Sequence, residues 1–313
     1  MEGLLRVLLS TDFYYGSIRM SAPLILAALG GIFSERAGVL SLGLEGMMLT
    51  GALAGFLGSF YTGSPWIGLL YAAVAGGLFA LVYAAACITF KANQVVAAVG
   101  LNILANGITG LIFRGAFGIT QDLKQATAFQ AVPIPGLSQI PVIGPILFNH
   151  LVPVYLAFLL VPAVIFVLYR TSWGLKLRSV GENPLAADTL GVKVSVMRYQ
   201  GVVISGVLAA LGGALLSIGF INTFIEGMTA GRGFVAFAAV IFGKWTPIGA
   251  FLSALLFGAA DALQLRIQAL GLPIPYQIMI LFPYLLALVA LVFSGRSQSP
   301  AALGSPYEKS GGS

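Results

Sequence analysis

The chain has 313 residues, of which 58% are hydrophobic and 8% charged, with 40 glycines and a formal net charge of +6. This composition excludes a soluble domain and is typical of a polytopic helical membrane protein. The single cysteine and single histidine exclude an internal disulfide and argue against a metal site built from these residues.

Residues 1–15 predict an N-terminal interfacial segment with a short helix from Gly3 to Ser10, because they are too weakly basic for a signal peptide. Residues 16–295 form the expected membrane domain. The expected spans are Ser17–Phe33, Ala37–Tyr61, Pro65–Phe90, Gln94–Phe113, Leu151–Tyr169, Val202–Ile221, Ile248–Ile267 and Tyr276–Phe293. Phe234–Phe242 is shorter than the roughly 20 residues of a full span, which indicates a half-helix. The prediction is an all-α protein with about 8–10 transmembrane helices.

The polar interval from Arg170 to Gln200 has five basic and two acidic residues, so the positive-inside rule places it in the cytoplasm. The same rule places 114–149 outside. Residues 296–313, rich in serine, glycine and proline, predict a disordered cytoplasmic tail. Because the basic residues lie in connecting segments, the positive charge indicates membrane orientation and no nucleic-acid partner.

A short helix is expected inside this polar interval. Asn183 suits its N-cap, Pro184 its first position and Gly191 the residue just past its end. Two turns are not stable alone, so a helix that presents Leu185, Ala187 and Leu190 makes most sense if a partner docks on it. An ordinary structured connector is the alternative.

The glycine-rich segment from Ala37 is followed by a proline-initiated helix at Pro65, and the segment from Gly231 is followed by another at Pro247. The two pairs cross the membrane in opposite directions in this topology. They therefore predict an inverted repeat, which in transporters places the substrate path at the repeat interface.

Polar residues on two spans are candidates for that path. Asn102, Asn106 and Thr109 share one helical face, because they are spaced at i, i+4 and i+7. Ser41 and Glu45 share a face of the glycine-rich segment. Each set either lines the path or bonds a neighbouring helix, and for Glu45 a helix end or an arginine is the alternative partner.

Other polar groups have more ordinary interpretations. Asp261 is expected to pair with a nearby cation, and His150 to lie at the membrane interface. No catalytic set is evident, so the chain is not expected to be an enzyme. The stretch AVIFGKW at Ala239–Trp245 lacks the first glycine and the hydroxyl residue of a phosphate-binding loop, so the chain is not expected to hydrolyse ATP itself, and no directly bound cofactor is expected.

Four stretches carry a family resemblance: SERAGVLSLGLEGMMLTGALAG at 34–55, GLNILANGIT at 100–109, TSWGLKLRSVGENPLAADTLGV at 171–192 and GRGFVAFAAVIFGKWTPIGAFLSALLFG at 231–258. They resemble the permease subunits of bacterial ATP-binding cassette (ABC) importers of the branched-chain amino acid and simple-sugar group. The similarity is strongest to the nucleoside-type permeases.

The resemblance implies a multi-pass subunit of the cell membrane that works with a second related permease, an ABC ATPase and an extracytoplasmic substrate-binding lipoprotein. Whether the permease pair is identical stays open. It also implies that one segment is the ATPase-coupling helix; its residues are Glu182, Asn183, Pro184, Leu185, Ala186, Ala187, Asp188, Leu190 and Gly191. The expected cargo is a nucleoside, with a simple sugar or branched-chain amino acid as alternatives. An ion-coupled secondary transporter is the alternative from another class.

Overall fold

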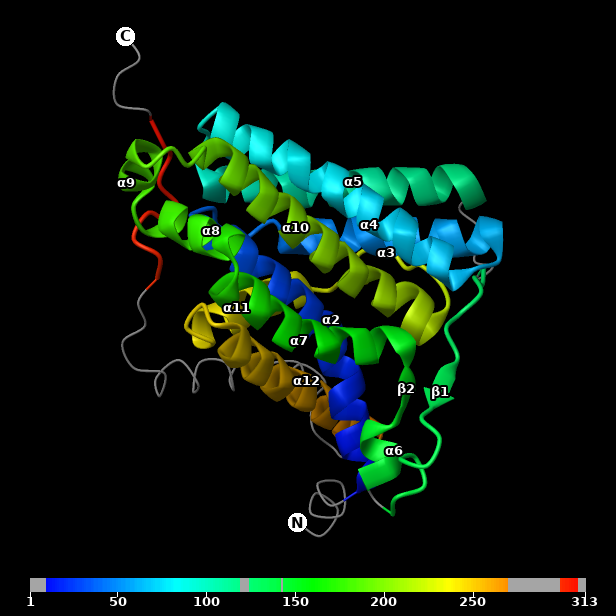
Figure 1. Ribbon diagram of the computed structural model, residues 1–313. Coiled ribbons are helices and arrows are strands. Elements are labelled where there is room, and N and C mark those ends of the chain that lie inside the picture. Colours follow the sequence, from blue (N-terminus) through cyan, green and yellow to red (C-terminus); the bar gives the residue numbers. More distant parts are fainter. Residues whose placement is uncertain (1–9, 119–123, 142, 270–298, 309–313) are drawn as a thin grey trace.

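The computed structural model describes residues 10–118, 124–141, 143–269 and 299–308, and these form a bundle of long helices with a short pair of strands at one end (Figure 1). Six of the described helical segments are long and apolar enough to cross a membrane. This confirms an all-α polytopic membrane protein.

The first described helix is α2, Thr11–Arg36, and its N-cap Ser10 accepts a hydrogen bond from the backbone of Phe13. The first span therefore begins earlier than Ser17, and residues 11–15, expected in an interfacial segment, belong to this helix. The interfacial helix expected from Gly3 lies outside the described residues, except for Ser10.

The other long helices overlap the predicted spans, although the one predicted from Ala37 begins at Leu44 and the one predicted from Val202 begins at Val194. They are α3 (Leu44–Thr62), α4 (Pro65–Ala84), α5 (Gln94–Phe117), α7 (Val152–Arg170), α10 (Val194–Ala214) and α12 (Pro247–Ala269). Proline is the first residue of both α4 and α12, where it costs no internal hydrogen bond. Two helices continue as π-helical turns, α4 through Ala85–Thr89 and α10 through Leu215–Ile221.

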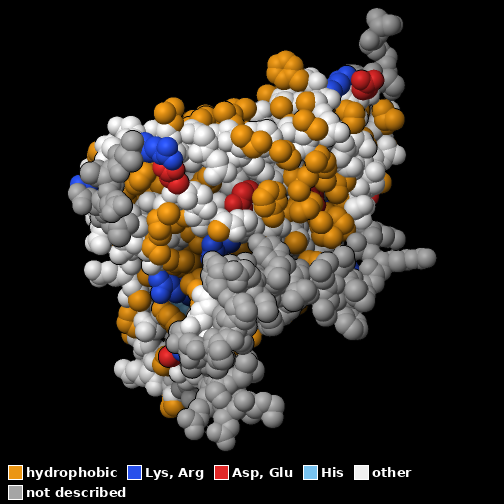
Figure 2. Space-filling model, turned by 180° about the vertical axis from the view of Figure 1, so that it is seen from behind, with side chains coloured by type: hydrophobic (Ala, Val, Ile, Leu, Met, Phe, Trp, Pro, Cys, Tyr) orange, Lys and Arg blue, Asp and Glu red, His pale blue; other side chains and the backbone are white. Residues whose placement is uncertain are grey.

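Helices α2 and α10 form the centre of the bundle. Most of each is buried, and α10 packs against α2, α3 and α4. Glycine permits these close approaches: a β-carbon at Gly213 of α10 would overlap the carbonyl of Met48 on α3. By contrast, only a third of the α4 and α5 spans is buried within the chain. The view from behind shows hydrophobic side chains over much of the surface and only small groups of charged ones (Figure 2).

The loop between α5 and α7 has structure of its own. Strand β1 (Ala131–Pro133) pairs antiparallel with β2 (Asn149–Leu151), and the short helix α6 (Ile143–Leu147) lies between them. The backbone of Ala126 also donates to Asn222, so this loop packs on the predicted outer end of α10.

Three shorter helices complete the described part of the membrane domain. The half-helix is present as α11, Arg232–Phe242, and the polar interval contains α8 (Ser172–Glu182), which was not predicted, and α9 (Pro184–Thr189). The expected span Tyr276–Phe293 lies outside the described residues. The inverted repeat stays a prediction.

Within the tail expected to be disordered, the structure gives Ser299–Glu308 defined contacts. Ala302 donates a backbone hydrogen bond to Gly181, and Gly304 donates one to Gly38. These residues differ from the expectation because their backbone groups bond to the bundle and because Leu303 and Tyr307 pack on its apolar clusters.

Candidate functional site

The start of α11 is joined to the start of α3 by Glu45. Its Oε1 accepts from the Thr229 hydroxyl at 2.6 Å and from the Gly231 backbone nitrogen at 2.9 Å, while Oε2 accepts from the Gly233 nitrogen at 2.7 Å. Glu45 is 8% exposed. A carboxylate at a helix N-terminus satisfies free backbone donors and interacts favourably with the helix dipole. Glu45 therefore caps α11, the helix-end alternative considered from the sequence.

Close approach at this cap requires glycine. A β-carbon at Gly233 would overlap the backbone nitrogen and α-carbon of Glu45. Gly231 has a φ of +85°, a conformation that other residues rarely adopt. Sequence reasoning missed these partners of Glu45, although two glycines flanking Arg232 just before a half-helix were a visible signal.

Asn102 connects α5 to the residues around the start of α3. Its Oδ1 accepts from the Gly46 backbone nitrogen at 2.9 Å, and its Nδ2 donates to the Leu42 carbonyl at 3.1 Å. Both ends of this buried amide are thus bonded within the chain. The geometry gives Asn102 the interhelical contact that was the alternative to a path-lining role.

Asn106 lies one turn further along α5 and is exposed. Its Nδ2 donates to the Asn102 carbonyl at 3.3 Å, a weak contact within the same helix. Thr109 is buried and donates to the Ala105 carbonyl at 2.7 Å. Of the stripe predicted on this helix, Asn106 is the member that offers polar groups to the exterior of the chain.

Ser41 belongs to a separate buried network. Its hydroxyl donates to Oε1 of Glu35 at 2.6 Å, and the indole nitrogen of Trp245 donates to Oε2 of the same carboxylate. The neighbouring Arg36 donates to the Trp245 carbonyl at 2.9 Å. From the sequence, an arginine such as Arg36 was one alternative partner for Glu45; the structure instead uses Glu35 and Arg36 to hold the α11–α12 turn against α2.

Between α10 and α11 the chain runs as irregular backbone beside α5. Arg114 on α5 makes a two-pronged ion pair with Glu226, with distances of 2.7 and 2.6 Å. This hydrogen-bonded pair lowers the pKa of Glu226. Further along, Gly227 lies near Asn106, and Thr229 reaches Glu45. The segment 222–231 therefore extends from near the outer end of α5 to the level of Glu45, with Ile225, Glu226 and Gly227 exposed.

The position of this segment carries an energetic consequence. Asn102 is eight residues beyond Gln94, the first residue of α5, or about 12 Å along the helix axis. The adjacent Gly46 and Glu45 lie at the same depth. Irregular backbone at membrane depth is tolerated only where protein covers it or where it lines a water-filled cavity. The exposed face formed by α5 and 222–231 is thus expected to meet another protein, water or both.

Asp261 of α12 lies 3.9 Å from Arg232, the first residue of α11. A pairing role was expected for Asp261, with Gln264 and Arg266 nearby in sequence; the partner is Arg232 instead, and Arg266 lies 3.4 Å from Asp12. Asp261 and Glu45 therefore both have partners within the chain.

The helix α9 is built as its sequence predicts. Asn183 accepts from the Ala186 nitrogen at 3.0 Å, and Gly191 follows the helix with a φ of +81°. Leu185 and Leu190 are 50% and 84% exposed. Ala187 was expected on the presented face, and this is wrong: it is 3% exposed and packs on Val180 and Val194. The exposed apolar side chains are therefore Leu185 and Leu190.

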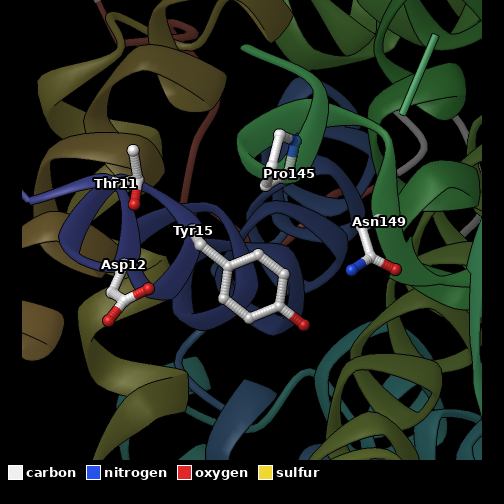
Figure 3. A pocket seen from close by; sticks show the side chains of 5 residues that line it. All are labelled: Thr11, Asp12, Tyr15, Pro145 and Asn149. Atoms are coloured by element: carbon white, nitrogen blue, oxygen red, sulfur yellow. The ribbon is translucent and has the colours of Figure 1, made fainter. Parts of the chain in front are cut away.

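A small pocket of about 210 Å³ lies at the opposite end of the bundle. Thr11, Asp12 and Tyr15 reach it from α2, Pro145 from α6 and Asn149 from β2 (Figure 3). The elements that line it lie apart from α5 (Figure 1). It is separate from the face described above.

His150 packs beside this loop, with its ring stacked on that of Tyr15 at 4.6 Å between centroids. Its Nε2 bonds the Ile146 carbonyl at 2.8 Å. Burial lowers the pKa of His150 from its usual 6.5, although the hydrogen bond opposes the shift. The neutral imidazole is thus part of the packing of the outer loop.

Comparison with known proteins assigns the chain to a family. Residues 13–291 match the model described as branched-chain amino acid transport system, permease component. No solved structure gives a significant match.

Three relatives extend over almost the full chain. The guanosine ABC transporter permease protein NupQ of Bacillus subtilis is 45% identical, over 92% of this chain and 94% of its own. The nucleoside ABC transporter permease protein NupC of Lactococcus lactis is 39% identical, over 93% and 94%. The putative glucose ABC transporter permease protein TsgC13 of Haloferax volcanii is 40% identical, over 94% and 96%.

Proposed function

The chain belongs to the family of permease components of branched-chain amino acid transport systems, and on that premise we propose that it carries a nucleoside across the membrane. It is a multi-pass permease subunit of an ABC importer in the plasma membrane. The named cargo of two of the relatives is guanosine or a nucleoside. The substrate, the path and the partners belong to the proposal.

One observation carries the proposed path: irregular backbone and an exposed amide share one face at membrane depth. We propose that a second, related permease covers this face, with a hydrated passage between the two chains. The carbonyls of Ile225 and Gly227 accept from the Met228 and Ala230 nitrogens, but the backbone nitrogens of 225–227 have no acceptor among the described residues. A lipid contact would leave these donors in hydrocarbon, which costs several kcal/mol for each unsatisfied group. Water in a passage closed on its other side by the second permease would hydrogen-bond these groups and remove that cost.

The chemistry of the face suits a neutral polar solute. The Asn106 amide supplies both donors and an acceptor, as ribose hydroxyls and base edges require. The acidic side chains nearby have partners within the chain, Glu45 at the α11 N-terminus and Glu226 in its pair with Arg114. A substrate with fixed charges would find no free counter-ion among the described residues of this face. This supports a nucleoside over an amino acid.

We further propose that an ABC ATPase docks on α9 and hydrolyses ATP, and that an extracytoplasmic binding protein delivers the solute. Leu185 and Leu190 form an exposed apolar pair on the side that the basic residues place in the cytoplasm. Burial of this pair by a partner removes apolar surface from water, which favours binding. An ion relay through Glu45 or Asp261 is less well supported, because both acids are bound to groups of this chain.

A simple sugar is the second candidate, because a relative named as a putative glucose permease is 40% identical. Glucose offers hydroxyls to the same amide but no base edge. The two are separated by uptake of labelled guanosine, uridine, glucose and leucine in cells with and without this chain. Loss of guanosine or uridine uptake alone supports the proposal, while loss of glucose or leucine uptake alone would overturn it.

A further inference from the structure

The segment Pro300–Glu308, called the strap below, lies beside α8 and α9 in the ribbon view (Figure 1). Its backbone joins two separate corners of the bundle. The Ala302 nitrogen donates to the Gly181 carbonyl at 2.9 Å, at the end of α8, and the Gly304 nitrogen donates to the Gly38 carbonyl at 3.1 Å, just after α2. The strap therefore links the loop that holds α9 to the membrane bundle.

A buried arginine depends on the strap for an acceptor. Arg198 on α10 is 1% exposed, and its Nη1 donates to the Ser305 carbonyl at 2.9 Å. Among the described residues, its Nε and Nη2 have no hydrogen-bond partner. Removing the acceptor of a buried charged donor is more costly than removing that of a neutral one. The Ser305 contact thus contributes to keeping the strap in place.

An apolar contact joins the strap to the cluster that holds α9. Tyr307 packs on the cluster formed by Val180 of α8, Ala187 of α9 and Val194 of α10. Ala187 is the residue that turns α9 inward, so the Tyr307 ring lies against the cluster that fixes the orientation of this helix. When Ala187 faces Val180 and Val194, Leu185 is left on the exposed side.

Charged contacts at both ends of the strap are weaker. Lys91 and Glu308 form an exposed ion pair at 2.9 Å, which contributes little on its own. The Ala301 nitrogen donates to Glu182 at 3.3 Å, and the same carboxylate lies 3.6 Å from Arg36. The backbone bonds, Arg198 and Tyr307 therefore provide most of the attachment.

From these contacts we infer that the strap is an intramolecular clamp, which holds α9 against the membrane domain with Leu185 and Leu190 facing outward. Two turns of helix cannot keep an orientation alone. The clamp supplies the missing constraint, so a push on α9 reaches α2 and α10 through hydrogen bonds. Its role in transport rests on the coupling function proposed above, whereas the clamp itself does not.

Cysteine labelling tests the clamp in this chain alone. Ala187→Cys, in a Cys87→Ala background, is reacted with an impermeant maleimide on inside-out vesicles. We compare the full chain, a truncation lacking residues 299–313 and a Tyr307→Ala variant. The expected labelling rate rises roughly tenfold in the last two, because local opening exposes the cluster. A truncation lacking only 309–313 keeps the strap and should label as slowly as the full chain.

Leu185→Cys is the matched control, since this side chain is already exposed and should label at one rate in all four chains. Equal rates for Ala187→Cys with and without the strap would overturn the clamp. If the long truncation fails to insert, Tyr307→Ala decides the same question. Solute uptake should fall in the variants that lack the strap or carry Tyr307→Ala. Faster labelling with unchanged uptake would overturn the role in transport, whereas ATPase binding that survives Leu185→Asp would count against the coupling function instead.

Discussion

The carboxylate of Glu45, on the second residue of α3, accepts a hydrogen bond from the backbone nitrogen of Gly233, in the first turn of α11, at 2.7 Å. The two residues are 188 positions apart in sequence. The contact fixes the end of a half-helix next to the face that we propose as the transport path. Any displacement of α3 relative to α11 must therefore break it or carry both helices together.

Replacing Glu45 by Gln should lower stability and uptake together. An amide retains one acceptor, but it turns its NH₂ group toward backbone donors that Glu45 now satisfies. We expect a loss of about 1–3 kcal/mol, as for a buried donor left unsatisfied. Thermal unfolding of the purified chain measures it. Glu226→Gln is the control, because that carboxylate is half-exposed and should contribute less. Equal effects of the two variants would contradict the capping role.

Gly233→Ala should disrupt the same cap from the other side. The added methyl group would overlap the backbone of Glu45, so α11 must shift away from α3. Overpacking of this kind costs about 1–3 kcal/mol. Gly100→Ala on α5 is the matched control, since its β-carbon would meet no described atom within 4 Å. The unfolding midpoint should fall for Gly233→Ala and not for Gly100→Ala. An unchanged midpoint for Gly233→Ala would show that the contact can accommodate a methyl group.

Asn102→Leu and Asn106→Leu should separate assembly from transport. Asn102 bonds Gly46 and Leu42, so its loss leaves buried groups unpaired and should reduce stability by about 1–3 kcal/mol. Asn106 is exposed to the proposed passage, so its loss should lower nucleoside uptake and leave the protein folded. Membrane yield, unfolding and uptake distinguish the two. Full uptake in Asn106→Leu would remove this residue from the path.

Leu185→Asp and Ala187→Asp should fail in different ways. The first places a charge in the proposed docking surface, where desolvation without a partner costs several kcal/mol, and it should abolish ATPase binding in a fully inserted protein. The second buries a charge among Val180 and Val194 and should destabilise the loop itself. Co-purification of the ATPase and protease sensitivity of the loop report the two effects separately.

Acid should weaken the packing of the outer loop through His150. Its folded pKa lies below the usual 6.5, so the folded form stays neutral while an opened form takes up a proton as the pH falls through 6.5. Stability is therefore complete above this value and declines below it. The unfolding midpoint should drop more for the native chain than for His150→Gln between about pH 7.5 and about pH 5. Parallel profiles would rule out this histidine as the cause.

Sequence patterns predicted the local features of this fold. Pro65 and Pro247 marked helix starts, Asn183 marked a cap, and the length of Phe234–Phe242 marked a half-helix. Each of these features depends on neighbouring residues, or on the length of a segment relative to the thickness of the bilayer. Both can be read from a single sequence.

The remaining features depend on groups distant in sequence. A shared helical face placed Asn102 and Asn106 together, but only the position of α3 makes one of them an interhelical contact and leaves the other exposed. Ala187 was expected on the exposed side of its helix. This was wrong because Val180 and Val194, on the neighbouring helices, decide which side of the short helix is buried. The strap was missed because composition reports neither its backbone hydrogen bonds nor the distant residues that Arg198 and Tyr307 bring to it.

The strap also sets an order of events during biosynthesis. Ser305 follows Arg198 by 107 residues, and α11 and α12 lie between them in the chain. The ribosome thus delivers α9 and α10 well before the segment that clamps them. The nascent chain therefore leaves α9 unclamped until α12 and the strap have been translated, so the orientation that we propose for ATPase docking is acquired only then.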